Sequence, residues 1–461
     1  MTSLDKTIEP DEPETHAETE PEIEHEELAA LASTAPVGGS VSDHIHNYWQ
    51  RVRGGDMGSL PAVSGLILLT VIFSLAQPSF HSLFNLGNMF TEGTATIFIA
   101  MGLVFVLLLG EIDLAAGYTA GVSAAVMGRL MVGYNWQWYL TIPAALITGL
   151  IIGFIVGWLR AKVRIPSFVV TLAFFLAFQG VMLYIVNNGK GQKGDLSLND
   201  NVVLAFANSQ MPLWLGWALG AAVVLGYAAV KVSARMARLR RGLAAEPLGV
   251  AGAKVAVLAA LSFVMIYLLS QNRSLHKTAI PTNVNGKIVL VTPPKVEGVP
   301  WVVPVLLVLF VAWTFLLGRT RYGRHLYAVG GNEEAARRAG IAVDRIRISV
   351  FVLSGFMSAI GGIMIASNVS GVSVQNYAGN TLLLAVGAAV IGGTSLFGGR
   401  GRMIDALIGG AVVEVIYNGL ANLVQGPNGS SVQFIATGIA LLLAAAVDAL
   451  SRRRAGASGL A

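Results

Sequence analysis

The chain has 461 residues, of which 54% are hydrophobic and only 12% are charged, whereas a soluble globular protein carries about 25% charged residues. Its mean hydropathy is +0.65, and apolar stretches near the roughly 20 residues that cross a bilayer recur along it. These totals exclude a soluble globular protein and predict an all-α polytopic membrane protein. The net charge of +5 is more typical of cytoplasmic loops than of a nucleic-acid-binding surface. The absence of cysteine excludes disulfides and cysteine-ligated metals.

Residues 1–40 form an acidic segment that is rich in Glu, Pro and Thr and has hardly an aromatic side chain. Such a segment cannot bury enough apolar surface to offset its chain entropy, so we expect a disordered cytoplasmic tail. It lacks the basic start and early apolar region of a signal peptide. Residues 41–59 follow as a juxtamembrane segment, and residues 60–455 form the predicted transmembrane domain.

Twelve apolar segments are candidates for transmembrane helices. The third and the tenth can be either complete spans or partial, re-entrant segments. The sequence therefore predicts about 10–12 transmembrane helices. In chain order the segments are Leu60–Ala76, Thr91–Leu109, Leu114–Val132, Trp138–Leu159, Ser167–Val186, Leu213–Val230, Ala253–Ser270, Trp301–Gly318, Ile348–Ala366, Leu382–Gly393, Ile404–Val424 and Val432–Leu450.

Clusters of arginine and lysine fall on one side of these predicted spans. The positive-inside rule makes that side the cytoplasm, which predicts a multi-pass protein of the plasma or inner membrane with both termini inside. The predicted extracytoplasmic loop 271–300 is also basic, and long translocated loops are often exempt from the rule. Within it, Asn285-Gly286 between alternating residues is a hairpin signal. A small ribbon that touches a soluble partner and a flexible insert both remain open.

The predicted cytoplasmic segment 319–347 contains the sequence of a short, self-capped helix. Asn332 suits the N-cap, and the acidic residues after it suit the positive end of the helix dipole. Gly340 can take the left-handed conformation that ends a helix. A surface helix that presses into a groove of another protein and an ordinary loop helix are equally open from these residues alone. The helix and its ends comprise Gly331, Asn332, Glu333, Glu334, Ala335, Ala336, Arg337 and Gly340.

The stretch GEIDLAAG, residues 110–117, places two carboxylates between apolar runs. Ionised groups are expensive in a bilayer, so each is expected to have a function or a partner. Asp113 precedes Leu114 and suits the N-cap of the third span, whereas Glu111 is expected to face water or a partner. The stretch GGTSLFGG, residues 392–399, aligns with it at both outer glycines and at the leucine, which favours an internal repeat with interrupted helices.

Five stretches resemble permease subunits of ABC monosaccharide importers of the ribose/xylose type, over nearly all of residues 60–450, and xylose-type permeases are the most alike. They are PSFHSLFNLGNMF, GEIDLAAG, IPSFVVTLAFFLAFQG, VGGNEEAARRAGI and VIGGTSLFGGRG. The resemblance implies a homodimeric pore that accepts its sugar from an extracytoplasmic binding protein and is energised by separate ATPase subunits, which bind the ATP. It also implies that residues 331–340 form the coupling helix. Leu382-Leu383-Leu384 stands where relatives often carry an acidic pair, so any role of that pair in sugar specificity is not transferred.

A polar stripe marks the eleventh predicted span, where Glu414, Asn418 and Asn422 recur every four residues and share one helical face. Pore lining and hydrogen bonding between helices are both open for the two asparagines, and Glu414 is expected at the pore or a dimer seam. Arg129 is expected to extend to the membrane interface. The residues expected on the translocation path are Gly110, Glu111, Asp113, Gly117, Gly392, Gly393, Thr394, Ser395, Glu414, Asn418 and Asn422.

The sequence contains no phosphate-binding loop, no histidine pair at metal-ligand spacing and no Gly-x-Ser-x-Gly elbow. We therefore expect a transporter subunit without its own ATPase site, cofactor or bound metal, rather than an intramembrane enzyme or a scaffold. The alternative is an ion-coupled secondary transporter of a small polar solute, in which Glu111, Asp113 or Glu414 titrates.

Overall fold

The computed structural model describes residues 59–243, 245–274, 280–284, 287–291, 294–377, 380–424, 429, 431–440, 442–443 and 446. The predicted acidic tail, the juxtamembrane segment up to residue 58 and the last arginine cluster lie outside these residues. Within the described part, strands are confined to two two-stranded ribbons. One pairs β1 (Leu196–Ser197) with β4 (Gly371–Val372), and the other pairs β2 (Ile280–Val284) with β3 (Lys287–Val291).

Each of the twelve predicted spans corresponds to a helix. In order these are α3 (Leu60–Ala76), α4 (Leu83–Leu108), α5 (Ala116–Tyr134), α6 (Trp138–Trp158), α7 (Ser167–Asn187), α9 (Leu213–Leu239), α10 (Leu248–Ser270), α11 (Val302–Arg319), α14 (Val343–Asn368), α15 (Asn380–Ile391), α16 (Met403–Leu423) and the final helix Ser431–Ala440. Nine helical segments of the described residues are long and apolar enough to cross a membrane. The prediction of an all-α polytopic membrane protein is confirmed.

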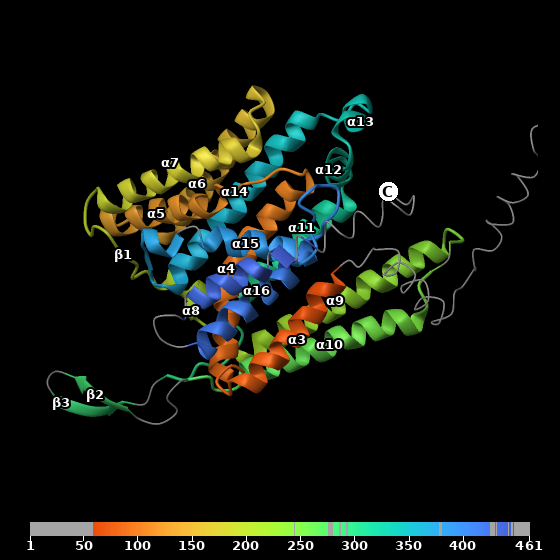
Figure 1. Ribbon diagram of the computed structural model, residues 1–461. Helices are drawn as coiled ribbons and strands as arrows, with labels where there is room; N and C mark the ends of the chain where they lie inside the picture. The colour runs from red at the N-terminus through yellow and green to blue at the C-terminus, as the bar shows by residue number, and fades with distance from the viewer. Residues whose placement is uncertain are drawn as a thin grey trace, which may run out of the picture.

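Shorter elements connect these helices. They are the π-helical turn η1 (Leu159–Val163), α8 (Asn201–Asn208), α12 (Arg321–Gly331), α13 (Glu333–Arg338) and the 3-10 turn η2 (Val374–Tyr377). Figure 1 shows α13 and the β2–β3 hairpin at opposite ends of the molecule. The two hairpin strands pair antiparallel with Val284 opposite Lys287. A two-residue connection therefore joins them at the predicted Asn285-Gly286, which itself lies outside the described residues.

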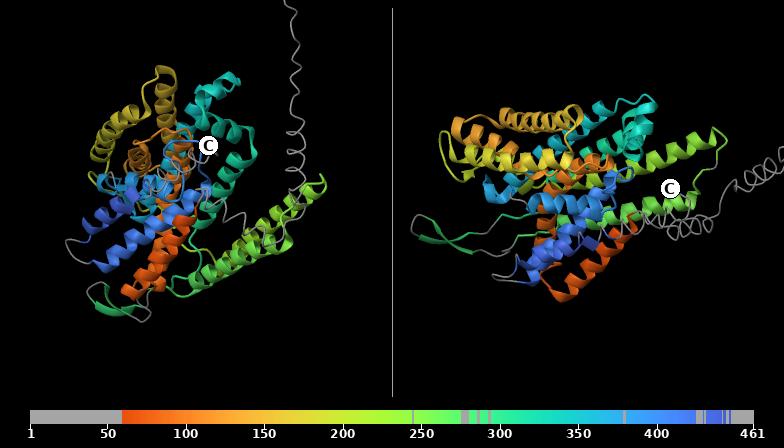
Figure 2. Two further views of the ribbon diagram at one scale, coloured as in Figure 1. Left: turned by 45° about the vertical axis from the view of Figure 1, so that its right-hand side comes forward. Right: turned by 45° about the horizontal axis from the view of Figure 1, so that its top comes forward.

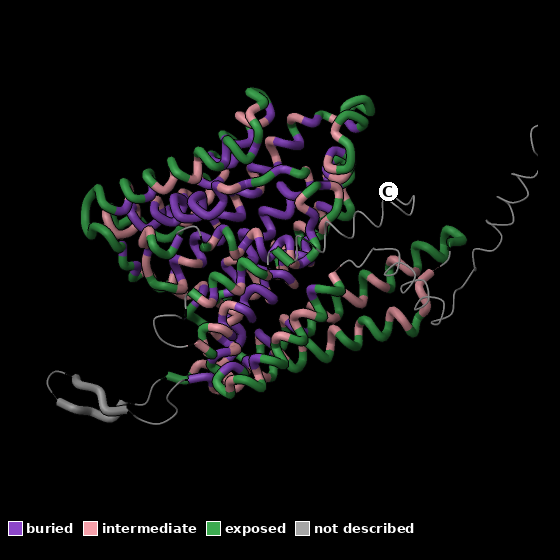
Figure 3. Tube along the Cα trace, in the orientation of Figure 1, coloured by how far each residue is buried: buried purple, intermediate pink, exposed green. Residues whose placement is uncertain are grey.

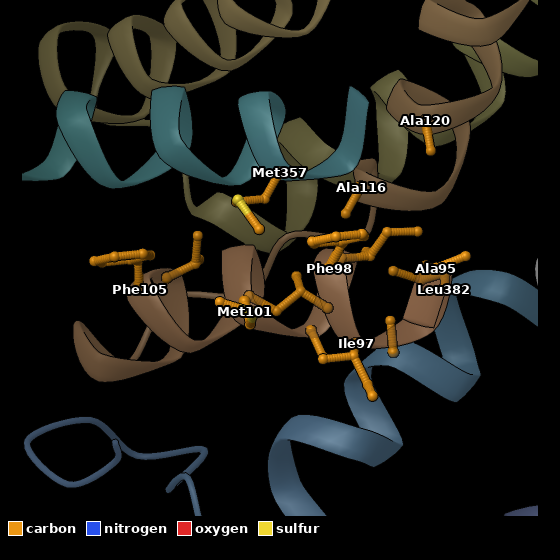
Figure 4. Close-up of a cluster of buried hydrophobic side chains, with 14 of the residues drawn as sticks. Ala95, Ile97, Phe98, Met101, Phe105, Ala116, Ala120, Met357 and Leu382 are labelled. Carbon is orange, nitrogen blue, oxygen red and sulfur yellow. The ribbon is translucent and has the colours of Figure 1, made fainter. Parts of the chain in front are cut away.

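Helix α4 is the centre of the bundle and is buried along most of its length (Figure 3). A helix that is apolar on all sides belongs inside a bundle, because every face can contact another helix. Figure 4 shows the resulting cluster, in which side chains of α4 meet residues of α5, α14 and α15. The helix begins eight residues before the predicted Thr91, because Ser82 accepts a hydrogen bond from the backbone N–H of Asn85 at 3.2 Å and caps its first turn.

The third and tenth predicted spans differ from their neighbours, as the sequence left open. Helix α5 has 19 residues and lies mostly buried within the bundle, but it is not among the nine apolar candidates. Helix α15 has 12 residues, which is about 18 Å and too short to cross the hydrocarbon core alone. The candidate span at this point, Val374–Ile391, also includes η2.

Helices α6 and α14 pack backbone to backbone through glycines of α6. Gly149, Gly153 and Gly157 recur every fourth residue, so they share one face of the helix. A Cβ on Gly149 would overlap the carbonyl oxygen of Gly355, and one on Gly153 would overlap that of Phe351. Small residues at such spacing allow membrane helices to approach closely.

Helices α9 and α10 pack against each other and are mostly exposed. Figure 2 shows this pair projecting from the other helices in both views. Apolar side chains such as Trp214, Leu225 and Phe263 lie on its surface. In a bilayer these faces can contact lipid, which accounts for a large apolar surface that a soluble monomer would not carry.

Candidate functional site

The predicted short helix forms as α13 and stands on the surface at one end of the bundle (Figure 1). The Oδ1 atom of Asn332 accepts the backbone N–H of Ala335 at 2.9 Å, which is the predicted N-cap. Gly340 has φ +80°, the left-handed conformation expected at the end of the helix. Ala336 is buried and faces the bundle, whereas Ala335 is exposed. The local structure of segment 331–340 therefore follows its sequence closely.

Two ion pairs run along α13 at i,i+4 spacing. Arg337 lies 3.0 Å from Glu333, and Arg338 lies 3.2 Å from Glu334. Both pairs are largely exposed, so each contributes about 0.3–0.5 kcal/mol to the helix. They leave α13 with a mixed-charge outer surface that carries both signs within two turns.

An arginine of α14 connects α13 to residues 110–113 between α4 and α5, which we name the GEID loop. Arg347 donates from Nε to Oε1 of Glu111 at 2.9 Å and from Nη2 to Oε2 of Glu333 at 2.8 Å. Arg160 of η1 completes the group, because its Nε lies 2.9 Å from both carboxylate oxygens of Glu111. Glu111 is buried. Of the two expected alternatives, water or a partner, the structure shows partners, which are two arginines of its own chain.

The electrostatics of this group keep Glu333 ionised. Partial burial raises the pKa of the Glu333 carboxyl, but hydrogen bonds and charges from Arg347 and Arg337 outweigh that effect and hold the pKa below its ordinary value of 4.5. At neutral pH the carboxylate is therefore available to both arginines.

Asp113 fixes the second half of the same loop. Its Oδ1 accepts the backbone N–H of Ala115 at 3.0 Å. Helix α5 begins at Ala116 with Ala115 at its N-cap, so the N-cap predicted at Asp113 lies two residues too early. The Oδ2 atom of Asp113 accepts the hydroxyl of Ser354 at 2.7 Å. Ser354 lies seven residues after Arg347, on the same face of α14. One face of α14 thus holds both carboxylates of the GEID loop.

The two loops of the predicted internal repeat meet each other and α12. The backbone N–H of Gly399 donates to the carbonyl of Leu108 at 2.9 Å. A Cβ on Gly330 of α12 would overlap that same carbonyl, and one on Gly110 would lie 3.2 Å from the carbonyl oxygen of Phe397. Glycine is required at Gly110 for its φ of +70° as well. Loops 110–113 and 392–399 therefore lie at the α12–α13 end of the bundle.

The remaining path candidates of these loops are close-packed. Thr394 and Ser395 are buried, and the hydroxyl of Thr394 lies 3.5 Å from Asp405 of α16. A Cβ on Gly392 would overlap the carbonyl oxygen of Asp405, and Gly393 has φ +120°. A Cβ on Gly117 would lie 3.0 Å from the Cβ of Leu382. These residues join α15 and α16 and seat α5 against α15.

The polar stripe of α16 lies apart from both loops. Asn418 and Asn85 of α4 exchange two amide hydrogen bonds of 2.7 and 3.0 Å. Asn422 bonds to Asn418 and accepts the hydroxyl of Ser79 at 3.3 Å. Glu414 is buried against Gly93 of α4, and its Oε1 atom has no hydrogen-bond partner among the described residues. The asparagines thus form hydrogen bonds between helices, whereas the Oε1 atom of Glu414 accepts no hydrogen bond from the described residues.

Sequence reasoning did not identify Arg347, Arg160 or Ser354 as site residues. Both arginines lie near predicted span ends on the basic side, where the positive-inside rule already accounts for them. Arg129 is buried and donates to the carbonyls of Ile185, Val186, Lys190 and Gln192. Its extension to the membrane interface stays a prediction. A charged side chain near an apolar run was the available signal for the three arginines.

The family described as "Branched-chain amino acid transport system / permease component" matches residues 85–446. This chain belongs to that permease family. The permease is 31% identical to the xylose transport system permease protein of Escherichia coli over 394 residues, which is 85% of this chain and 92% of that relative. It is 30% identical to the xylose permease protein of Haemophilus influenzae over 84% of this chain and 96% of the relative. The ribose import permease protein of Haemophilus influenzae is 29% identical over 83% of this chain and 90% of its own length.

No solved structure matches the permease. The family resemblance predicted from the five motifs is confirmed, since the matched region contains α4 to α16 and with them both repeat loops and α13. The family description and the relatives' descriptions differ in the solute that they name, so family membership by itself leaves the solute open.

Proposed function

We propose that this chain is the transmembrane permease subunit of an ABC importer that moves a monosaccharide, D-xylose or a related sugar, into the cell. The carrying observation is its 31% identity to a xylose permease over 92% of that relative. The capped surface helix α13 at one end of the bundle supports the same function, because a transporter driven by a separate ATPase needs a rigid element that the ATPase can bind.

The proposed partners lie at the two ends of the bundle. ATPase subunits bind ATP and contact α13, whose exposed surface carries ion pairs of both signs. An extracytoplasmic binding protein delivers the sugar at the end with the β2–β3 hairpin (Figure 1). The α13 end also carries Arg160, Arg319 and Arg402, in keeping with a cytoplasmic position in the plasma or inner membrane. Both termini are then cytoplasmic, and two copies of the chain form the pore.

The proposed translocation path uses the polar stripe of α16. Glu414 has an unpaired carboxylate oxygen that can accept a sugar hydroxyl, and Asn418 and Asn422 follow on the same face. Asp113 and the small residues of loops 110–117 and 392–395 lie at the α13 end, where a sugar would leave. Tight binding by the permease is unnecessary when the binding protein recognises the sugar.

The unpaired oxygen of Glu414 also favours a second candidate, an ion-coupled secondary transporter of a small polar solute. A buried acidic side chain without a partner is a typical site of proton coupling in membranes. This candidate does not explain α13, because a secondary carrier requires no ATPase contact.

Uptake of labelled D-xylose separates the two candidates. Cells lacking the chain are compared with cells that express it, once with a protonophore at constant ATP and once with ATP depleted. Uptake that requires the chain and ATP but survives the protonophore supports the importer, whereas uptake lost with the proton gradient supports the secondary carrier. Competition by unlabelled D-ribose then ranks the two sugars.

The contact with the ATPase is tested by alanine at Glu333 and Arg337 together. We expect ATP hydrolysis to continue while sugar uptake falls. The matched control is alanine at Lys162 and Asp344, an exposed ion pair of 2.9 Å between η1 and α14 that does not include α13. Uptake that stays unchanged in the α13 variant would contradict the coupling role.

A further inference from the structure

The ion-pair group around Glu111 connects four segments that are distant in the sequence. Glu111 lies between α4 and α5, Arg160 in η1, Arg347 in α14 and Glu333 in α13. Arg347 is the member that joins the surface to the interior, because one edge of its guanidinium bonds to Glu111 and the other to Glu333. A planar guanidinium can bind two carboxylates at once in a fixed geometry, which a lysine ammonium cannot reproduce.

The two sides of this bridge differ in burial. The side chains of Arg347 and Glu111 are 8% and 6% exposed, whereas that of Glu333 is 43% exposed. Breaking a buried ion pair leaves an uncompensated charge and is strongly unfavourable, but an exposed pair contributes little. Any force on α13 will therefore open the Glu333 contact first and leave the Glu111 contact intact. The inner pair is also protected by Arg160, which binds Glu111 independently.

The interior side of the bridge is a rigid unit. Arg347 and Ser354 lie on one face of α14 and bind Glu111 and Asp113, the two carboxylates of the same loop. That loop joins α4, the central helix of the bundle, to α5. A displacement of α13 that reaches Arg347 thus reaches α4, α5 and α14 together.

We propose that Arg347 is a positioning residue that fixes α13 against the GEID loop and transmits movements of α13 to α4, α5 and α14. Glu111 is its permanent anchor, and Glu333 is the weaker contact, through which movements of α13 pass while it is closed. Transmission during transport rests on the proposed importer function, whereas the positioning of α13 does not. The two carboxylates of the GEID loop then hold α14 and, through Arg347, connect α13 to the bundle.

Spin labels measure the position of α13 directly, and the absence of cysteine from the chain makes single labelling sites clean. One label is placed at Ile112→Cys, an exposed position in the GEID loop, and the other at Ala335→Cys, an exposed position on α13. Electron–electron distances are measured on the full chain in lipid nanodiscs. The unmodified network should give one narrow distance distribution.

Three variants separate positioning from folding. Arg347→Lys keeps a positive charge beside Glu111 but cannot bridge to Glu333. Glu333→Gln removes the ion pair with Arg347 and, with it, the i,i+4 ion pair with Arg337 on α13. We expect both to give normal amounts of folded protein and a broadened distance distribution. The control Glu334→Gln removes an exposed ion pair of the same helix that has no link to the bundle, and it should leave the distribution narrow. A narrow distribution in Arg347→Lys, or equal broadening in the control, would overturn the proposal.

The transport arm uses the complex with the ATPase subunits. In Arg347→Lys we expect the sugar moved per ATP hydrolysed to fall by roughly fivefold or more, in the usual range of coupling between sites, while the control Lys162→Met keeps the wild-type ratio. An unchanged ratio in Arg347→Lys overturns transmission. The label distances require neither sugar nor ATPase, so they test positioning alone. A wild-type chain that restores uptake of no monosaccharide would instead overturn the proposed function.

Discussion

Replacing Gly153 by alanine tests the close packing of α6 on α14. A Cβ at this position would overlap the carbonyl oxygen of Phe351 and lie 2.8 Å from the Cα of Val352. Both atoms belong to backbone that is fixed within a helix, so neither can rotate away. Overpacking of this kind costs about 1–3 kcal/mol, and a backbone clash belongs near the upper end. Alanine recovers about 1 kcal/mol of helix propensity, which leaves a net loss of about 2 kcal/mol by these two figures.

The matched control is Gly180→Ala in α7, where a Cβ would meet nothing within 4 Å. Only the propensity gain remains there, so this variant should be as stable as the wild type or more stable by up to about 1 kcal/mol. Unfolding of the purified chain in mixed micelles, followed by tryptophan fluorescence, gives both values. If Gly153→Ala proves as stable as Gly180→Ala, the backbone contact between α6 and α14 is not as close as described.

Three further predictions concern polar groups. The arginine partners hold the pKa of Glu333 below 4.5, so its ion pairs are complete above that pH and are lost as the pH falls through the lowered value. The distribution of distances between spin labels on α13 and the GEID loop should therefore broaden only below pH 4.5. Arg129→Met should lower stability by about 1–3 kcal/mol by leaving buried carbonyls unpaired, measured by the same unfolding assay. Asn418→Ala should cost about 1 kcal/mol, because an amide pair between membrane helices is worth little more. An Asn85→Ala/Asn418→Ala double variant should cost less than the sum of the two single variants, because the bonds between the two amides are lost only once.

The helices were predictable because their signal is local and strong. Apolar runs near 20 residues identify spans regardless of what packs around them, and the capping chemistry of α13 is complete within ten residues. The start of α4 was missed because Asn85, Gly87 and Asn88 interrupt the apolar run that a span requires. The Ser82 cap before them was the local signal that could have corrected it.

The site was less predictable because its contacts join distant residues. Glu111 and Arg347 are 236 residues apart, and neither periodicity nor spacing relates them. The backbone contact of Asp113 lies only two residues away, so it was within reach of local reasoning, although α5 begins at Ala116 and not at the predicted Leu114. Arg347 could not be assigned, because an arginine at the predicted cytoplasmic end of a span satisfies the positive-inside rule without any further role.

The geometry also distinguishes between the acidic residues that were candidates for the sugar path. A solute could bind Glu111 only by displacing Arg160 or Arg347, and removing a partner from a buried ion pair costs about 3–5 kcal/mol. That cost is about the same as the value of two well-aligned, charge-assisted hydrogen bonds to a sugar, about 1.5–3 kcal/mol each, so the exchange brings no net gain. Glu414 imposes no such cost, because its Oε1 atom has no partner to lose among the described residues. Under the proposed function, a sugar that needs an acidic contact within the bundle is therefore expected to find it on α16, and the carboxylates of the GEID loop are proposed to connect α13 to the helices around that path.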